Sequence, residues 1–265
     1  EISVRDWSSD VCSSDLDAVV LATADSGRAV VVDTGPEPGP VGDCLDRLGV
    51  DSVPLVILSH LHADHIGGLA AVLSHRHVGA VAVGPARMPG WAWREVTGYA
   101  NRAGVPLVRL DVGTRLTWPG LTIDVLGPLP GEAQPVARAD GTEINNSSVV
   151  VRAHTPAGRI LLTGDIELLA QADLLATRAD LTADILKVPH HGSRFSAPAF
   201  LDAVRARIAV ISVGANNRYG HPSPSTLAFL TRRGTQLTRT DTDGDTAIVP
   251  GPRAILRGQP RPTPT

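Results

Sequence analysis

Short apolar runs separated by turn-forming residues extend along most of the chain. Residues 18–21 and 29–32 are apolar and are joined through Asp25-Ser26-Gly27, which is the pattern of a β-hairpin. Residues 148–153 and 159–163 predict a second hairpin. Other patterns predict strands at 55–58, 78–83, 184–188 and 208–213, shorter strands between 107 and 126 and around Asp243-Gly244, and helices at 41–48, 66–73, 91–103, 167–176 and 197–206.

The order of these elements indicates the fold class. Hairpins alternate with strand–helix units, an order that is typical of layered α/β proteins. A chain of 265 residues can bury one sizeable core. We therefore expect one α/β sandwich domain over residues 17–250, with polar side chains gathered in the loops at the strand ends.

The two ends of the chain differ from this pattern. Residues 1–16 contain a Ser/Asp repeat with neither strand nor helix period, and we expect them to be a foreign or disordered leader. Residues 251–265 are rich in Pro and Arg, and we expect a disordered tail. Both segments lie outside the predicted domain.

Composition limits the classes of function. No apolar run reaches the roughly 18–20 residues that cross a bilayer, so the sequence predicts a soluble polypeptide. The formal net charge of -3 argues against a broadly basic surface for nucleic acid, but it is compatible with a local Arg patch. The chemistry must therefore come from particular clusters of side chains.

The segment Ser59-His60-Leu61-His62-Ala63-Asp64-His65 carries the strongest chemical signal. It places three imidazoles and one carboxylate directly after the apolar strand at 55–58. In extended backbone His60 and His62 point the same way, whereas Asp64 and His65 follow where a helix is expected to begin. Imidazole combined with carboxylate suits Zn or Mn, and two ions about 3.5–4 Å apart are a recurring hydrolytic device. We therefore predict two divalent metal ions, Zn or Mn.

Two later segments add candidate ligands. Asp165 ends an apolar strand, where a carboxylate serves either as the N-cap of the following helix or as a bridge between two ions. His190-His191 also follows a buried strand. Because adjacent residues of an extended chain point opposite ways, we expect one imidazole to ligate metal and the other either to face substrate or to support the ligands without binding the ion.

Two further polar positions have more than one interpretation. Asn145-Asn146 either orients a scissile group or forms a turn before the next strand. His221, in Tyr219-Gly220-His221-Pro222, is interpreted as a general acid, a substrate contact or a loop residue. The residues themselves leave these alternatives open.

The motifs resemble those of a known superfamily. His60-x-His62-x-Asp64-His65, followed by Thr163-Gly164-Asp165 and a later histidine, is similar to the metallo-β-lactamase superfamily over residues 17–249. This resemblance implies a four-layer αββα sandwich with a dinuclear metal site at the edge of its two sheets. A narrower set is similar to the hydrolase domain of ComEC-type DNA-uptake proteins: Asn145-Asn146-x-Ser148, Lys187-Val188-Pro189-His190-His191-Gly192-Ser193, Asn217-x-Tyr219-Gly220-His221-Pro222 and Arg239-Thr240-Asp241-x-Asp243-Gly244.

The resemblance also implies partners and roles. In ComEC-type proteins the domain accompanies a membrane channel, so DNA and a channel domain are the expected partners. An extracytoplasmic location is implied, with a cytoplasmic one as the alternative. Asp33, in an Asp-Thr-Gly turn, would support the ligands. The implied ligands are His60 and His62 for one ion, Asp64 and His65 for the second, Asp165 between them, and His190 in preference to His191.

The chain departs from the family pattern in two places. Many superfamily members supply a further histidine ligand ahead of the Gly-Asp strand, where this chain has Asn145-Asn146. This difference affects the affinity and the identity of the metal in the first position. ComEC-type domains begin with Gly-Gln-Gly-Asp-Ala, of which Asp17-Ala18 is present.

The leading functional hypothesis is metal-dependent hydrolysis of a phosphodiester in DNA, by a phosphodiesterase or nuclease associated with DNA uptake. Its candidate catalytic residues are Asp64, His191, His221 and Asn146, of which the last three would hold the phosphate or protonate the leaving oxygen. One alternative keeps the site but hydrolyses a lactone, thioester or other ester. Another is a non-catalytic DNA- or ligand-binding domain in which the metal serves folding.

Overall fold

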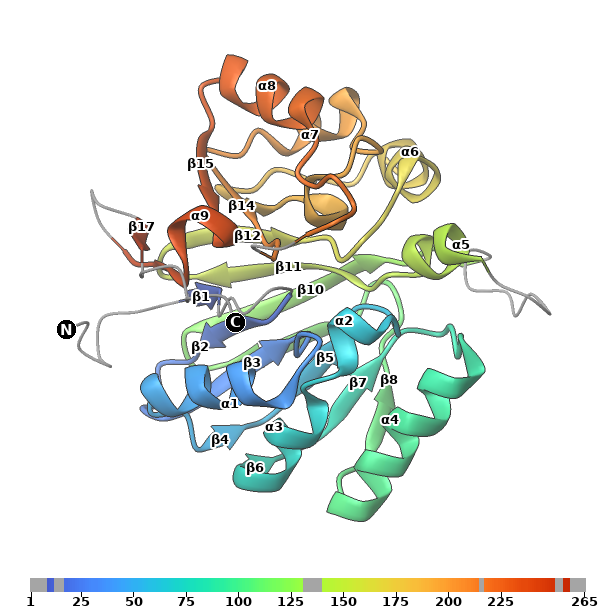
Figure 1. Cartoon of the computed structure of the whole chain (residues 1–265), viewed down its shortest axis with the longest axis vertical. Coiled ribbons are helices and arrows are strands. Elements are labelled where there is room, and N and C mark those ends of the chain that lie inside the picture. Colours follow the sequence, from blue (N-terminus) through green and yellow to red (C-terminus); the bar gives the residue numbers. More distant parts are fainter. Residues whose placement is uncertain (1–8, 12–16, 131–139, 215–216, 251–254, 258–265) are drawn as a thin grey trace.

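Two β-sheets pack face to face around one shared apolar layer (Figure 1). This computed structural model describes residues 9–11, 17–130, 140–214, 217–250 and 255–257. The shared layer contains buried side chains from both sheets, such as Val30 and Ile57 from one and Ile123 and Ile160 from the other. Helices cover the outer faces, so the predicted four-layer αββα sandwich is confirmed.

The first sheet has eight strands, and its central strands are buried on both faces. Val31 and Val56 point away from the shared layer and pack under helices. This double burial explains why these strands are continuous apolar runs. The strand order is β17 (Ile255–Arg257), β16 (Thr246–Ile248), β1 (Ser9–Val11), β2 (Val19–Ala22), β3 (Ala29–Val32), β5 (Val56–Leu58), β7 (Val81–Val83) and β8 (Leu107–Arg109).

The second sheet has seven strands. Its order is β15 (Gln236–Arg239), β14 (Ile208–Ile211), β13 (Ile185–Lys187), β12 (Gly158–Leu162), β11 (Val150–Thr155), β10 (Leu121–Gly127) and β9 (Arg115–Trp118). Buried and half-buried residues alternate along β10, because successive side chains point to opposite faces of the sheet and only one face meets the core. A separate two-stranded sheet pairs β4 (Ser52–Val53) with β6 (His77–Val78).

Helices pack on the outer face of each sheet (Figure 1). The first sheet is covered by α1 (Pro38–Arg47), α3 (Leu69–His75) and α4 (Gly90–Ala103), and the second by α6 (Leu168–Ala176), α7 (Pro198–Val204) and α8 (Pro224–Arg232). None of the helices in the described residues has the length and apolar character that a membrane crossing needs. Shorter elements are α2 (Ala63–Ile66), α5 (Gly141–Asn146), α9 (Thr240–Asp243) and the 3-10 turn Pro189–Gly192.

Parallel strands in both sheets end at the segments that carry the predicted site. In the first sheet β3 leads to Asp33 and β5 leads to His60. In the second sheet β12 leads to Asp165 and β13 leads to His190. Ligand sites of open α/β sheets lie outside the carboxyl ends of the strands. The topology therefore brings distant parts of the sequence to one edge of the sandwich.

The predicted helix at 66–73 is divided into α2 and α3 by Gly67-Gly68. A Cβ atom on Gly67 would lie 1.9 Å from the carbonyl oxygen of Pro36, and one on Gly68 would lie 2.1 Å from that of Thr34. Only glycine fits where two backbone segments approach so closely. Glycine is therefore required at both positions, and the predicted single helix is wrong.

Other elements differ from the sequence prediction. Helix α8 lies outside the predicted elements, although Ser223 caps it by accepting a hydrogen bond from the Thr226 backbone N–H (3.3 Å). The predicted strands on both sides of Asp243-Gly244 are confirmed as β15 and β16, but β15 joins the second sheet and β16 the first.

Parts of both expected end segments pair with the first sheet. Ser9–Val11, within the expected leader, form β1 between β2 and β16. Ile255–Arg257, within the expected tail, form β17 beside β16. The rest of the expected leader and tail lies outside the described residues.

Candidate metal centre

His65 is held by a carboxylate at its Nδ1 atom. Oδ2 of Asp33 lies 2.9 Å from His65 Nδ1, and Asp33 itself accepts hydrogen bonds from the backbone N–H and the hydroxyl of Ser59, both at 2.7 Å. A partner on Nδ1 fixes the ring and leaves Nε2 for another role. Asp33 therefore has the supporting position that the resemblance implied for it.

His191 is held in the same manner by a backbone carbonyl. Its Nδ1 atom lies 2.9 Å from the carbonyl oxygen of Ser212, which follows β14. Its Nε2 atom points instead to two carboxylates, 3.2 Å from Oδ2 of Asp165 and 3.5 Å from Oδ2 of Asp64. Among the described residues, neither His65 Nε2 nor His191 Nε2 has a hydrogen-bond partner, although both are buried.

The Nε2 atoms of His65 and His191 and the Oδ2 atoms of Asp64 and Asp165 surround one point, and we call these four residues the cage. His65 Nε2 lies 3.4 Å from Asp165 Oδ2 and 3.7 Å from Asp64 Oδ2, which completes four N···O edges between 3.2 and 3.7 Å. Tetrahedral ligands at the usual zinc distances are about 3.4 Å apart. A divalent ion fits this arrangement, and it would satisfy two imidazole nitrogens that are otherwise buried without partners.

Electrostatics in the cage favour a cation. Burial opposes charge on His65, but the carboxylates of Asp165, Asp33 and Asp64 outweigh it and raise its pKa well above the usual value. Burial likewise opposes charge on His191, and Asp165 and Asp17 outweigh it, so the pKa of His191 rises to about 10. Protons on these rings occupy the positions that a metal ion would otherwise take.

Asp17 and Lys187 form a buried pair next to the cage. Asp17, His65, Asp165 and His191 each offer a ligand atom within 4.8 Å of the others. The Asp17 carboxylate, however, lies 3.7 Å from the Nδ1 atoms of both histidines and pairs with the Lys187 ammonium, whereas Oδ2 of Asp64 lies 3.7 and 3.5 Å from their Nε2 atoms. We therefore assign Asp64, and not Asp17, to the cage. The sequence motifs contained Asp17 and Lys187 but gave no indication that they pair.

Asp165 is not a helix cap. Helix α6 begins at Leu168 with Glu167 at its N-cap position, so the capping alternative is wrong. Oδ2 of Asp165 faces the cage, and its other oxygen lies 3.5 Å from Nζ of Lys187. Burial raises the pKa of Asp165, but the charges on His191, His65 and Lys187 outweigh it and hold this pKa well below the usual value.

Three further imidazoles lie on the other side of Asp165. His60 Nε2 lies 3.0 Å from His62 Nδ1, and His190 Nε2 lies 3.9 Å from Asp165 Oδ2. Burial is the largest cause that lowers the pKa of His60, His62 and His190, so all three rings are neutral at pH 7. Neutral imidazole is the form that binds metal. This group offers ligands for a second ion.

The local backbone turns both neighbouring histidines toward the site. His190 has φ 48° and His191 has φ 54°, so both adopt the left-handed conformation inside a 3-10 turn. Non-glycine residues adopt this region at a cost, and such strain is concentrated at functional sites. The expectation that the two rings point in opposite directions assumed an extended backbone, which these two residues do not have. The geometry favours His191 over His190 for the cage, the reverse of the preference from sequence.

Asn145 and Asn146 have structural roles. Both lie in α5, where the sequence suggested a turn. Oδ1 of Asn146 accepts a hydrogen bond from the backbone N–H of Glu167 (2.8 Å) at the start of α6, which gives this side chain a structural role. Nδ2 of Asn145 donates to Oε1 of Glu167 (2.9 Å), and the same oxygen lies 3.3 Å from Nδ1 of His190. The asparagines thus position Glu167 beside His190.

His221 lies on the open side of the cluster. Its ring centroid is 5.2 Å from that of His190 and 6.4 Å from that of His191. Partial burial and the neighbouring His190 and His191 lower its pKa to about 4, so the ring is neutral at pH 7. Of the three interpretations from sequence, a contact with substrate fits this position best.

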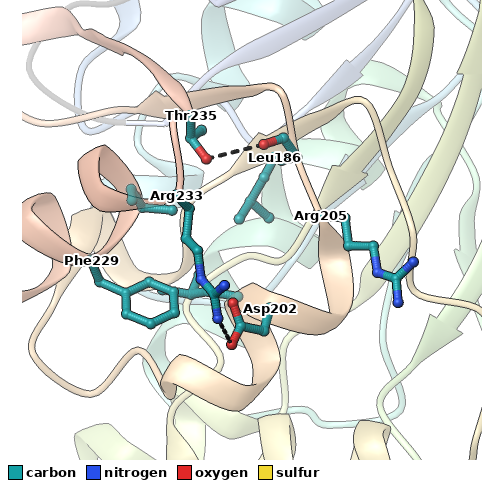
Figure 2. Close-up of a pocket in the computed structure, with 9 residues that line it drawn as sticks. Leu186, Asp202, Arg205, Phe229, Arg233 and Thr235 are labelled. Atoms are coloured by element: carbon teal, nitrogen blue, oxygen red, sulfur yellow. Dashed lines mark hydrogen bonds and ion pairs between the residues drawn. The ribbon is translucent and has the colours of Figure 1, made fainter.

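A separate cavity lies between α7, α8 and the second sheet. Figure 2 shows it, with a volume of about 460 Å³, an apolar floor that includes Leu186 and Phe229, and Arg205 at its rim. Asp202, the carboxylate in its lining, is paired with Arg233. The cavity contains no imidazole and none of the predicted site residues, so the candidate site is the histidine cluster.

An αββα sandwich with imidazoles and carboxylates at its strand ends defines a class of metal-binding proteins. The sequence profile of the metallo-beta-lactamase superfamily matches residues 17–214, and the chain belongs to this superfamily. Its members are generally metal-dependent hydrolases. Zn²⁺-bound PqqB from Methylobacterium extorquens has the same fold, with a TM-score of 0.52 at 14% identity over 84% of this chain and 85% of that one.

The chain is similar in sequence to competence proteins. It is 32% identical over 201 residues to ComE operon protein 3 of Bacillus subtilis, covering 76% of this chain and 25% of that protein. It is 28% identical over 222 residues to competence protein ComA of Neisseria gonorrhoeae, covering 83% and 28%. The chain therefore spans about a quarter of the length of these two relatives. A hydroxyacylglutathione hydrolase of Albidiferax ferrireducens is 28% identical over 170 residues, covering 63% and 60%.

Proposed function

We propose that the chain is a metal-dependent phosphodiesterase that cleaves DNA during uptake. The observation that carries the proposal is the cage, in which two buried Nε2 atoms that have no hydrogen-bond partner among the described residues face two carboxylates. The similarity to a competence protein supports DNA as the substrate. A divalent ion, Zn or Mn, would supply charge for the transferring phosphoryl group and lower the pKa of a bound water.

The position of each residue in the cluster indicates its role. Asp64, His65, His191 and Asp165 would hold one ion, because the four N···O distances between their ligand atoms, 3.2–3.7 Å, are close to the edge of a tetrahedral zinc shell. His60 and His62 would hold a second ion together with Asp165, since both rings are neutral and face the same space. Asp33 and Ser212 keep the Nδ1 atoms occupied and so fix the direction of each Nε2.

The open side of the cluster would receive the phosphate. His190 and His221 face each other there, with ring centroids 5.2 Å apart. The neutral His221 ring would donate its one N–H to a phosphoryl oxygen, whereas the one N–H of neutral His190 would point from Nδ1 to Glu167, at 3.3 Å, and fix the orientation of that ring. We infer that His221 contacts the phosphate and that His190, held by Glu167, lies beside it.

The cellular context is part of the same proposal. By resemblance to ComEC-type proteins, the domain would act outside the cytoplasmic membrane, beside a channel domain through which DNA passes. The similarity to ComE operon protein 3 over a quarter of that protein's length supports a domain of this kind.

Turnover assays test the activity. The protein is stripped of metal, loaded with Zn or Mn, and given single-stranded oligonucleotides, bis-p-nitrophenyl phosphate, a thioester, a lactone and a simple ester. We expect cleavage of both phosphodiesters, loss of cleavage in Asp165→Asn, and full activity in the control Asp43→Asn, whose side chain is exposed on α1.

The other outcomes separate the alternatives. Turnover of the thioester, lactone or ester without phosphodiester cleavage would replace the proposal with an ester hydrolase, the activity class to which the similar hydroxyacylglutathione hydrolase points. DNA binding without any turnover would favour a binding domain in which the metal serves folding.

A further inference from the structure

A series of rings extends outward from the cage to the surface. The His221 ring lies 6.4 Å from that of His191 with an angle of 26° between the planes, and the Tyr219 ring lies 6.5 Å from that of His221 with an angle of 21°. Tyr219 is 85% exposed. A large aromatic side chain so exposed, and nearly parallel to a ring of the site, offers its face to a planar ligand next to the reacting group.

The segment that carries Tyr219 is held in place. Oδ1 of Asn217 accepts a hydrogen bond from the backbone N–H of Tyr219 (2.7 Å), and Nδ2 of Asn217 donates to the carbonyl oxygen of His221 (2.5 Å). The backbone N–H of Ser223 donates to the carbonyl oxygen of Gly192 (2.8 Å), which ties this segment to the turn that contains His191. Hydrogen bonds within residues 217–221 and between Ser223 and Gly192 thus fix the backbone of Tyr219 relative to the site.

Exposed cationic and aromatic groups are present on both of these segments. Arg218 precedes Tyr219 and is exposed. On the neighbouring segment Arg194 is exposed, and its guanidinium lies 5.0 Å from the centroid of the Phe195 ring. We call Arg194, Phe195, Arg218 and Tyr219 the outer platform. Alternating Arg and aromatic groups match a single-stranded nucleic acid, since aromatic faces stack on unpaired bases and guanidinium groups meet phosphates.

We propose that Tyr219 is a specificity-determining residue that stacks on an unpaired base next to the reacting phosphate, while Arg218 and Arg194 contact the flanking phosphates. This inference rests on the proposed function for its substrate. A duplex would fit less well, because its bases are paired and their faces are hidden from an aromatic side chain. The outer platform therefore selects single strands.

Binding tests the inference without requiring turnover. The zinc-loaded full chain is titrated into a fluorescent 12-mer of thymidine with phosphorothioate linkages, which resist cleavage, and into an abasic strand of the same length and charge. We expect Tyr219→Ala to raise the Kd for the thymidine strand about 5- to 100-fold and to leave the abasic Kd unchanged. Tyr219→Phe and Tyr219→Trp should bind like the native protein, and so should the control Tyr99→Phe, since Tyr99 lies on α4 with its hydroxyl on Glu95.

Contact is measured separately by photo-crosslinking. A strand containing 5-iododeoxyuridine should crosslink to the peptide that contains Tyr219, and the crosslink should disappear in Tyr219→Ala but persist in Tyr99→Phe. The inference is overturned if the native protein binds neither strand, if Tyr219→Ala changes both Kd values equally, or if it changes neither. Cleavage of DNA with an unaffected Tyr219→Ala variant would refute only this inference, whereas Tyr219-dependent binding without cleavage would refute only the proposed phosphodiesterase.

Discussion

Oδ2 of Asp33 lies 2.9 Å from Nδ1 of His65 and keeps the Nε2 atom of that ring directed at the cage. Removal of a carboxylate that holds a metal-binding histidine commonly weakens metal affinity by about 10- to 100-fold. Asp33→Asn should therefore weaken zinc binding about 10- to 100-fold in a competition titration against a chromophoric chelator. The control Asp25→Asn, in the exposed turn after β2, should leave the affinity unchanged, and equal affinities for all three proteins would contradict this role for Asp33.

The two neighbouring histidines should differ in their effect on metal content. His191→Ala removes a cage ligand whose Nε2 lies 3.2 Å from Asp165 Oδ2, so this variant should lose the ion held by the cage. In His190→Ala all four cage residues remain, and that ion should be retained. Elemental analysis of the two purified variants after dialysis checks this difference. Loss of the cage ion in His190→Ala and its retention in His191→Ala would reverse our assignment.

The Lys187–Asp17 pair should be important for stability. Both side chains are buried, and removing one partner from a buried pair costs about 3–5 kcal/mol. Lys187→Met should lower the free energy of unfolding by that order, as measured by urea denaturation, and Lys187→Met with Asp17→Asn should recover part of the loss. Arg28→Met, which breaks an exposed pair with Asp25, should cost less than about 1 kcal/mol. A Lys187→Met effect as small as this control would argue against a buried charge pair.

Zinc binding should release protons. Without metal, the pKa of His65 is raised and that of His191 is about 10, so both rings are cationic at pH 7, with a proton on each nitrogen. The pKa values of Asp64 and Asp165 are lowered, so both carboxyl groups are already ionised. One zinc ion should therefore displace about two protons at pH 7. Calorimetric titrations in two buffers with different ionisation enthalpies measure this number. Binding without proton release would mean that these two rings are not ligands.

The metal-free protein should become less stable in alkali. The folded-state pKa of His191, about 10, is above its ordinary value near 6.5, so its contribution is fully present below about pH 6.5 and is lost as the pH rises through 10. The melting temperature of metal-free protein should fall between pH 7 and pH 10, and His191→Ala should flatten this dependence. An identical fall in the variant would assign the effect to another group.

The sequence was sufficient to predict the layered fold and the segments that form the site, because apolar runs mark the strands and polar clusters mark their ends. It was insufficient where the outcome depends on backbone conformation or on contacts between distant residues. The left-handed conformations of His190 and His191 reverse the expected assignment of their rings, and nothing in the local pattern signals them. The cap that Asn146 provides for α6, and the pair between Lys187 and Asp17, likewise join parts of the chain that only the fold brings together.

The most direct test of the central claim is a crystal structure of the zinc-loaded protein. We expect an ion about 2.0–2.1 Å from Nε2 of both His65 and His191, with an oxygen of Asp64 and of Asp165 in the same shell. Zinc bound elsewhere, with both Nε2 atoms free of metal, would contradict it.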